Sequence, residues 1–208
     1  MVPTEPVRCT VALPEGRLVG SGTHRYTKRF ADLDGLYADE AAYRTLLAEL
    51  AGTVVYEVTD LRPSERAGDM ITGVTRMMPG RVGREFFLTR GHIHAKADRP
   101  EIYFGQSGQG LMLLESPAGE TRVVAIGPQT LCYVPPFWIH RSVNVGPTDL
   151  VMLFAYPADS GQDYDIIARS GGMRSRILDD GAGGWVEVPN PAWLPRSPAT
   201  IASLLAAA

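Results

Sequence analysis

Short apolar runs rich in β-branched and aromatic residues dominate the middle of the chain, and turn residues separate them at near-regular intervals. This rhythm is typical of a β-sandwich or barrel, in which alternate residues of several strands can face one cavity. The glycine-rich residues 105–110 are interpreted as a hairpin turn and not as a nucleotide-binding loop, because no helix follows them. The predicted strands are residues 53–61, 70–78, 84–95, 101–116, 121–127, 130–136, 140–146 and 150–157.

Residues 39–52 carry the one strong helical pattern. Acidic residues open this segment, and a glycine follows its last apolar residue, as at many helix ends. A short helix is predicted over residues 163–171 and a closing hairpin over residues 173–191. The apolar residues at helical spacing are Ala42, Leu46, Leu47 and Leu50.

These elements predict a mainly β fold with one barrel domain over residues 36–190 and a few short helices. Residues 1–35 mix β-prone pieces with glycine and proline, which predicts an arm or edge strands. Residues 191–208 are broken by proline and then rich in alanine, which predicts a marginal helix or a partly disordered tail. With 208 residues, of which 45% are hydrophobic, we expect no second full domain.

Charge and cysteine content narrow the range of possible partners and cellular compartments. A net charge of −3 gives no general attraction to phosphate backbones. Cys9 and Cys132 are far apart, which fits a reducing compartment without structural disulfides. The chain lacks both an apolar run of about 20 residues and the regions of a signal peptide. We therefore expect a cytoplasmic protein that binds neither nucleic acid nor membranes.

Two histidines one residue apart open the most distinctive stretch, GHIHAKADRPEIYFGQSGQG at residues 91–110. On a strand, His92 and His94 leave the same face about 6 to 7 Å apart, close enough to bind one ion. An aspartate and a proline then favour a turn, which would bring Glu101 on the neighbouring strand to the same point. This spacing predicts the first part of a metal site.

His140 is the fourth candidate ligand, because two prolines mark a turn before a strand that would enter beside the first pair. Three imidazoles and one carboxylate suit one divalent ion, Fe, Mn, Co, Ni or Zn, and leave room for water or substrate. In the alternative interpretation, His92 and His94 lie in an exposed loop and His140 packs in the core.

The stretch at residues 91–110, together with YVPPFWIHRSVNVG at residues 133–146, resembles the two motifs of the cupin superfamily. Over longer segments, including GREFFLTRGHIHAKADRPEIYFGQSGQGLMLLESPAGE and YPADSGQDY, the chain closely resembles the cupin-type glucose-6-phosphate isomerases of archaea and some bacteria. The likeness covers about residues 50–190. The spacing from His94 to Glu101 is longer than in many cupins.

The resemblance implies a cupin-type β-barrel (a double-stranded β-helix or jelly roll) that works as a homodimer in glycolysis and gluconeogenesis. Such an enzyme interconverts glucose 6-phosphate and fructose 6-phosphate with one divalent metal ion. Gln162 stands where this family often has a histidine, so the phosphosugar range stays open. The implied positions are His92, His94, Glu101 and His140 for the metal, Thr75, Thr89, Gly91 and Tyr156 for the phosphate, and Tyr103 with the nearby Tyr164 for the sugar.

Aldose–ketose isomerisation moves a hydrogen between C1 and C2, and a metal at O1 and O2 would stabilise the developing negative charge. In an enediol route Glu101 is the expected catalytic base, whereas a hydride shift needs no such base. Three alternatives stay open: a non-haem iron dioxygenase, an isomerase of another phosphosugar such as mannose 6-phosphate, and a sugar-binding cupin without catalysis.

Overall fold

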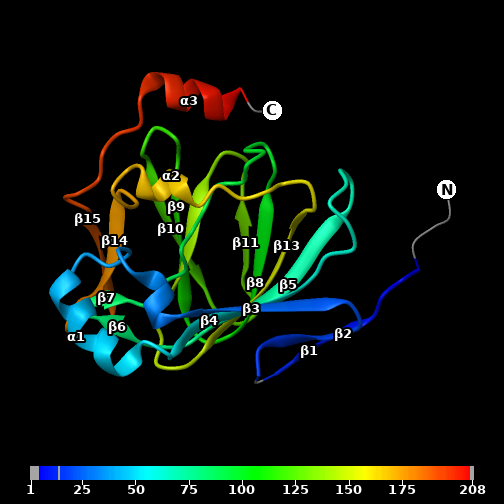
Figure 1. The fold of residues 1–208 in the computed structure, drawn as a ribbon, viewed down its shortest axis with the longest axis horizontal. Coiled ribbons are helices and arrows are strands. Elements are labelled where there is room, and N and C mark those ends of the chain that lie inside the picture. The colour runs from blue at the N-terminus through cyan, green and yellow to red at the C-terminus, as the bar shows by residue number, and fades with distance from the viewer. Residues whose placement is uncertain (1–4, 14, 207–208) are drawn as a thin grey trace.

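The structure, a computed structural model, describes residues 5–13 and 15–206. Residues 1–4 and 14 of the predicted arm and residues 207–208 of the predicted tail lie outside the described residues. Antiparallel strands dominate, which confirms the predicted mainly β class (Figure 1). The strands are β1 (Cys9–Ala12), β2 (Arg17–Gly20), β3 (Thr23–Arg29), β4 (Val54–Leu61), β5 (Met70–Met77), β6 (Arg81–Val82), β7 (Glu85–Phe86), β8 (Glu101–Ser107), β9 (Gly110–Glu115), β10 (Thr121–Ile126), β11 (Leu131–Val134), β12 (Ile139–Asn144), β13 (Leu150–Pro157), β14 (Ser175–Asp179) and β15 (Trp185–Pro189). The helices are the 3-10 helix η1 (Phe30–Leu33), α1 (Glu40–Leu50), α2 (Asp165–Ala168) and α3 (Pro198–Leu205).

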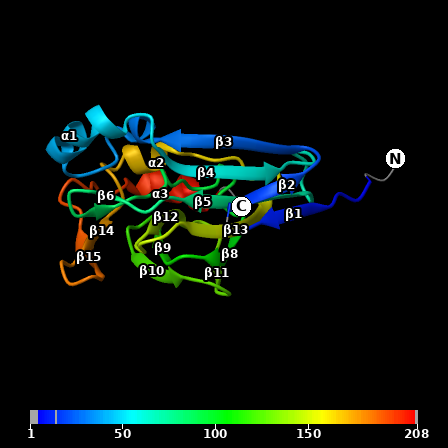
Figure 2. The same ribbon diagram turned by 90° about the horizontal axis from the view of Figure 1, so that it is seen from below.

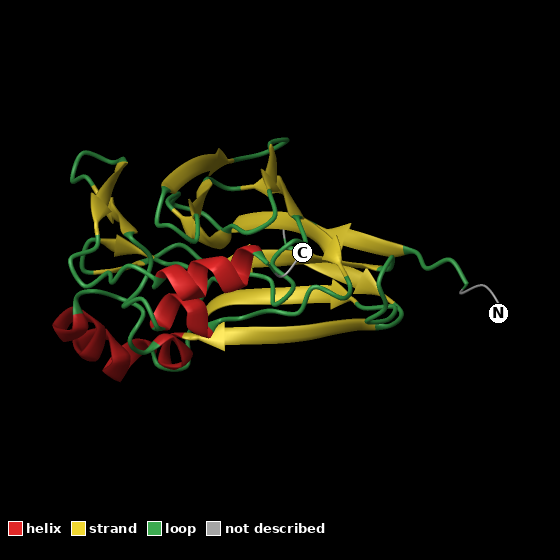
Figure 3. Ribbon diagram, turned by 90° about the horizontal axis from the view of Figure 1, so that it is seen from above, coloured by secondary structure: helices red, strands yellow, loops and turns green. Residues whose placement is uncertain are grey.

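Two antiparallel sheets form the barrel. The larger has six strands in the order β11-β8-β13-β5-β4-β3, and the smaller has three in the order β10-β9-β12. A further sheet, β15-β14-β7-β6, extends the barrel, and β1 and β2 form a separate hairpin. Figure 2 shows β3 and β4 side by side, on the opposite side of the molecule from β10 and β11. The helix α1 lies at the other end of the molecule from the N-terminal segment (Figure 3).

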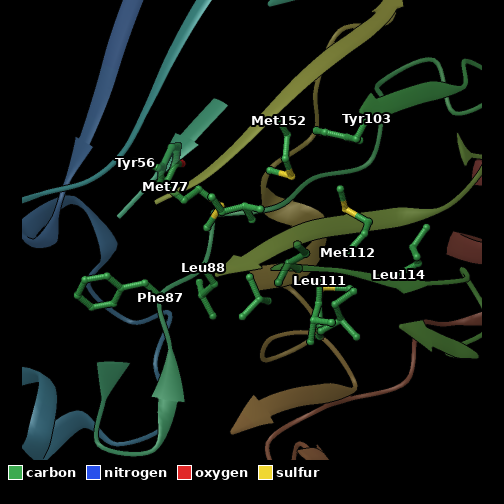
Figure 4. Packing of buried hydrophobic residues seen from close by; sticks show 14 of the residues in the cluster. Tyr56, Met77, Phe87, Leu88, Tyr103, Leu111, Met112, Leu114 and Met152 are labelled. Carbon is green, nitrogen blue, oxygen red and sulfur yellow. The ribbon is translucent and has the colours of Figure 1, made fainter. Parts of the chain in front are cut away.

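The hydrophobic core fills the space between the two barrel sheets. All six residues of β9 are buried, as expected for the central strand of the smaller sheet. Met77, Met112 and Met152 are fully buried and point into this space (Figure 4). Methionine is unbranched and flexible, so it fills irregular gaps between sheets. Among the described residues, no helix is long and apolar enough to cross a membrane.

The helix predicted at residues 39–52 is confirmed as α1. Asp39 caps it, because the Ala42 N–H donates to the Asp39 side chain at 2.9 Å. The most buried residue of α1 is Tyr43, whose ring stacks on Phe30 at 4.8 Å between centroids and whose hydroxyl donates to the Phe30 carbonyl. The four predicted aliphatic positions are only partly buried, since this aromatic pair fills the contact between α1 and η1.

The prediction of a single strand over residues 84–95 is correct only for the start of the segment and wrong for the rest. Only Glu85–Phe86 forms a regular strand, and isolated bridges follow, including one between His92 and His140. Gly91, with a φ of +72°, adopts a left-handed conformation in the middle of the segment. The chain therefore continues extended toward the cleft but leaves the regular ladder.

The hairpin predicted at residues 105–110 is also wrong. Strands β8 and β9 on either side belong to different sheets and do not pair with each other. Gly108 has a φ of +80°, and a Cβ there would lie 2.3 Å from the Asp149 carbonyl oxygen, so only glycine fits. This turn carries the chain from one barrel sheet to the other.

Parts of both terminal regions pack on the barrel. Strand β3, within the predicted arm, is the edge strand of the larger sheet. The short helix predicted at residues 163–171 and the hairpin at residues 173–191 are confirmed as α2 and as the β14–β15 pair. In the predicted tail, the Arg196 guanidinium forms a buried ion pair with Glu115 of β9. The division of the chain into three regions stays a prediction.

Candidate active site

A cleft opens between the inner face of the larger sheet and β12 of the smaller one. Its walls come from β3, β4, β5, β8, β12 and β13 and from the loops at residues 89–92 and 162–164. The predicted site residues that line this cleft are Thr75, Thr89, Gly91, His92, Glu101, Tyr103, His140, Tyr156 and Tyr164. His94 is buried beside them, in contact with Glu101.

The four predicted metal ligands meet in the cleft, and all four are buried. Glu101 Oε2 lies 3.0 Å from His140 Nε2, 3.3 Å from His94 Nε2 and 3.8 Å from His92 Nε2. The ligand atoms of His92, His94 and Glu101 all lie within 4.8 Å of one another. Reciprocal backbone hydrogen bonds of 3.0 and 2.9 Å join His92 and His140, so the bridge holds two ligands in register.

The outer nitrogens of two imidazoles face backbone carbonyls. His94 Nδ1 lies 2.7 Å from the Arg99 carbonyl oxygen, and His140 Nδ1 lies 3.1 Å from that of Trp138. A carbonyl only accepts, so these contacts favour a proton on each Nδ1, which would leave each Nε2 free to bind a cation. Within the described chain, the Nε2 atoms of His92 and His94 are buried without a hydrogen-bond partner. One divalent cation would satisfy all these acceptors, so the residues fit a metal ion.

Burial and mutual contacts favour the metal-binding protonation states. Burial lowers the pKa of His92, and the neighbouring His140 lowers it further. Burial acts to raise the pKa of Glu101, but the close contacts with the His140 and His94 imidazoles outweigh it, and the net pKa falls below its ordinary value. Neutral imidazole and ionised carboxylate are the forms that bind metals.

Ion pairs fix the loop between His94 and Glu101. Arg99 Nη2 and Lys96 Nζ lie 2.9 Å and 2.7 Å from the same oxygen of Asp159. Arg99 lies outside the predicted site, yet its carbonyl sets the orientation of the His94 ring. The turn between the ligands therefore positions a ligand as well as connecting two strands.

Hydrogen-bond donors gather around Thr89 and Gly91. The Ser142 N–H donates to Thr89 Oγ1 at 3.0 Å and fixes this side chain against β12. Arg141 is 5% exposed, donates to a backbone carbonyl at 2.7 Å, and has no partner for its Nε among the described residues. Burial lowers the pKa of Arg141 only to about 10, so the guanidinium stays cationic at neutral pH. Such a group suits an anion.

Tyrosines line much of the remaining surface. Burial raises the pKa of Tyr103, and Glu101 raises it further, so the Tyr103 hydroxyl is a donor at neutral pH. The Tyr164 hydroxyl donates to Gln162 Oε1, and the Arg90 guanidinium lies 4.8 Å from the Tyr164 ring centroid. Gln162 therefore holds Tyr164 in place at the edge of the cleft.

Several residues of β3, of β4 and of the loop directly after β4 line the cleft although the sequence did not identify them. They include Tyr26, from the region predicted as an arm, and Tyr56, Asp60 and Arg62. The available signal was the alternation along residues 56–60, which puts Tyr56 and Asp60 on one face of a strand. That signal is ambiguous, because β4 is buried on both faces.

A family model and the curated relatives agree on the family to which this chain is similar. Residues 27–194 match the family described as Glucose-6-phosphate isomerase (GPI). The "Putative glucose-6-phosphate isomerase 1" of Rhizobium meliloti (strain 1021) is 63% identical over 200 residues, covering 96% of this chain and 93% of that protein. The "Glucose-6-phosphate isomerase" of Thermococcus kodakarensis is 44% identical over 188 residues, covering 90% and 96%. Among solved structures, oxalate oxidase in complex with glycolate aligns with a TM-score of 0.40 and 14% identity, over 69% of this chain and 55% of that one.

Proposed function

Since this chain belongs to the glucose-6-phosphate isomerase family, we propose that it interconverts glucose 6-phosphate and fructose 6-phosphate with one divalent ion held by His92, His94, Glu101 and His140. The observation that carries the proposal is the convergence of three imidazoles and one carboxylate in a cleft that also offers donors for a phosphate. Fe, Mn, Co, Ni and Zn all suit these donors. When bound, the ion supplies a Lewis acid for O1 and O2 of the sugar.

We assign phosphate binding to Thr75, Thr89, Gly91 and Tyr156, all of which line the cleft. The two threonines and the tyrosine offer hydroxyl donors, and Gly91 has no side chain to keep a phosphate oxygen from the backbone. Arg141 adds a positive charge beside Gly91. An anchored phosphate would restrict the sugar to one orientation, with C1 and C2 toward the ligand cluster. We assign contacts with the sugar to the remaining predicted residues, Tyr103 and Tyr164.

Glu101 is the catalytic base in this proposal. Its carboxylate is ionised, so it can take a proton from C2 of the open-chain aldose and return it to C1, while the hydroxyl proton of O2 passes to O1. The protonated Tyr103 hydroxyl beside it can donate to a substrate oxygen. Deuterium from D₂O entering the product would support this enediol route, whereas strict retention of the hydrogen would support a hydride shift.

The test is conversion of fructose 6-phosphate by protein stripped with a chelator and reloaded separately with Mn, Fe, Co, Ni or Zn. We expect activity only after reloading. In Glu101→Gln, turnover should fall at least about 100-fold, measured per bound metal ion to correct for weaker binding. The proposal would be refuted by metal-loaded protein that forms no glucose 6-phosphate from fructose 6-phosphate. Formation of mannose 6-phosphate would then indicate an isomerase of that phosphosugar, and oxygen uptake by the ferrous form would indicate a dioxygenase.

We also propose that the enzyme is cytoplasmic, since its charged substrates do not cross membranes unaided. We further propose that it forms a homodimer. On the outer face of the larger sheet, Leu131 and Tyr133 of β11 are 62% and 55% exposed and lie opposite Phe104 and Ile102 of β8. This apolar face ends at an edge strand, which can pair with its own copy about a twofold axis. Light scattering should give twice the chain mass of 22.6 kDa, and Tyr133→Lys should give monomers.

A further inference from the structure

We propose that Asp60 binds a hydroxyl group of the phosphosugar that is remote from its metal-bound end, and so helps to select the substrate. This inference rests on the proposed function and adds a specificity-determining residue to it. Asp60 belongs to β4 and lines the same cleft as the ligand cluster.

Alternation along β4 directs Asp60 into the cleft. Val58 and Asp60 both line it, whereas Glu57 and Thr59 lie on the opposite face of the strand. On that opposite face, the Leu18 N–H of β2 donates to Thr59 Oγ1 at 2.7 Å. The strand therefore carries two buried acids, Glu57 facing the β1–β2 hairpin and Asp60 facing the cleft.

The two carboxylate oxygens of Asp60 have different surroundings. Arg62 donates from both Nε and Nη2 to Oδ2, at 2.9 and 2.6 Å. The other oxygen, Oδ1, is buried and has no hydrogen-bond partner within residues 5–13 and 15–206. A buried acceptor without a donor is unfavourable, and the fork of Arg62 restricts how Asp60 can turn. Oδ1 is thus an oriented acceptor at a cleft wall.

The chemistry of this acceptor identifies its partner. A phosphate ester carries negative charge and its oxygens accept hydrogen bonds, so a carboxylate repels it. A sugar hydroxyl donates a hydrogen bond and carries no charge, so it complements Oδ1. The donors around Thr89, Gly91 and Arg141 complement the phosphate instead. A ligand with one anionic group and several hydroxyls fits both parts of the cleft.

The register of the larger sheet places Asp60 away from the ligand cluster. Asp60 lies opposite Gly73, Gly73 opposite Phe154, and Phe154 opposite Tyr103 of β8. Three steps of about 4.8 Å separate the backbones of Asp60 and Tyr103 by roughly 14 Å along the sheet. Since Glu101 also lies on β8, Asp60 reaches hydroxyls remote from O1 and O2.

Steady-state kinetics of Asp60→Ala and Asp60→Asn, as metal-loaded full-length protein, would test this role. Glu57→Ala is the matched control, because Glu57 lies on the same strand, is equally buried and pairs with Arg25, but does not line the cleft. KM and kcat for fructose 6-phosphate and the inhibition constant of inorganic phosphate would be measured for each variant. Metal content and Tm would show whether each variant is folded.

We expect Asp60→Ala to raise the KM for fructose 6-phosphate about 10- to 100-fold, as for the loss of one hydrogen bond to a charged group. The change in kcat should be smaller, and the inhibition constant of inorganic phosphate should stay the same, because phosphate binds elsewhere in the cleft. Asp60→Asn should shift KM in the same direction but less. Glu57→Ala should leave KM unchanged.

The outcomes separate the two proposals. Wild-type protein that turns over no phosphosugar would refute the proposed function itself. Active wild-type protein whose KM is unchanged in both Asp60 variants would overturn only the role of Asp60. A rise in the inhibition constant of inorganic phosphate in parallel with KM would likewise overturn the role of Asp60. If Asp60→Ala does not fold, Asp60→Asn decides by the same two constants.

Discussion

Removal of the Arg196 guanidinium should destabilise the fold without changing the cleft. Arg196 Nη1 lies 2.7 Å from Glu115 Oε1, and Glu115 is 0% exposed. Glu115 also accepts hydrogen bonds from Trp193 Nε1 at 3.0 Å and from the Arg174 N–H at 2.7 Å. One buried carboxylate at the end of β9 therefore attaches the C-terminal segment to the central strand of the smaller sheet.

Arg196→Ala would leave Glu115 buried with two neutral donors and no cation. Breaking a buried ion pair costs about 3 to 5 kcal/mol. We expect the lower end, about 3 kcal/mol, because two donors to Glu115 remain and the Nε and Nη2 atoms of Arg196 lack partners among the described residues. For a chain of this length, such a loss lowers Tm by roughly 6 to 12 °C.

Calorimetry of the metal-loaded protein would measure the change, with KM for fructose 6-phosphate recorded in parallel. Arg122→Ala is the control, because its partner Glu120 lies 3.7 Å away and both side chains are about two-thirds exposed. Exposed pairs contribute little, so the control should leave Tm nearly unchanged. An equally small shift in Arg196→Ala would refute the reasoning, since it would mean that desolvation already cancels the attraction of the buried pair.

Gly91→Ala should reduce metal content and Tm, because φ is +72° and a Cβ would lie 2.9 Å from a facing carbonyl oxygen; an unchanged metal content would contradict this. Asp159→Asn should release the loop whose carbonyl orients His94 and weaken metal binding about tenfold in chelator competition, whereas unaltered affinity would rule out this coupling. In metal-free protein the pKa values of His92 and Glu101 lie below their ordinary values, so the unfolded chain binds more protons in acid. The contribution of His92 to the free energy of unfolding should therefore fall as the pH drops below about 6.5, and the contribution of Glu101 should fall below about pH 4.5. A Tm that is independent of pH between 8 and 4 would be inconsistent with these shifts.

The ligand cluster is the part of the site that sequence spacing predicts best. His92 and His94 face the same way in any extended segment, so the wrong strand boundary over residues 84–95 did not affect their placement. His140 is different, because its position depends on pairing with a segment far away in the chain. The proline turn before its strand and the motif resemblance both pointed to His140, but neither fixes that long-range pairing.

The features that sequence alone missed depend on long-range packing. Strand β4 is buried on both faces, so alternation does not say whether Glu57 or Asp60 faces the cleft. Arg196 lies in a proline-rich segment that is typical of an exposed tail, yet it is buried against β9. A glycine turn such as that at residues 105–110 serves a hairpin or a crossing between sheets equally well, and only the partner strands decide.

The backbone bridge between His92 and His140 has a consequence for protein synthesis in the cell. At about 5 to 20 residues per second, a ribosome needs roughly 2 to 8 s to extend the chain from Glu101 to His140. For that interval the nascent chain carries three of the four proposed ligands and lacks the strand that aligns them. Metal uptake would therefore be a late event in translation, and the ions available when the barrel closes would influence which metal the finished protein holds.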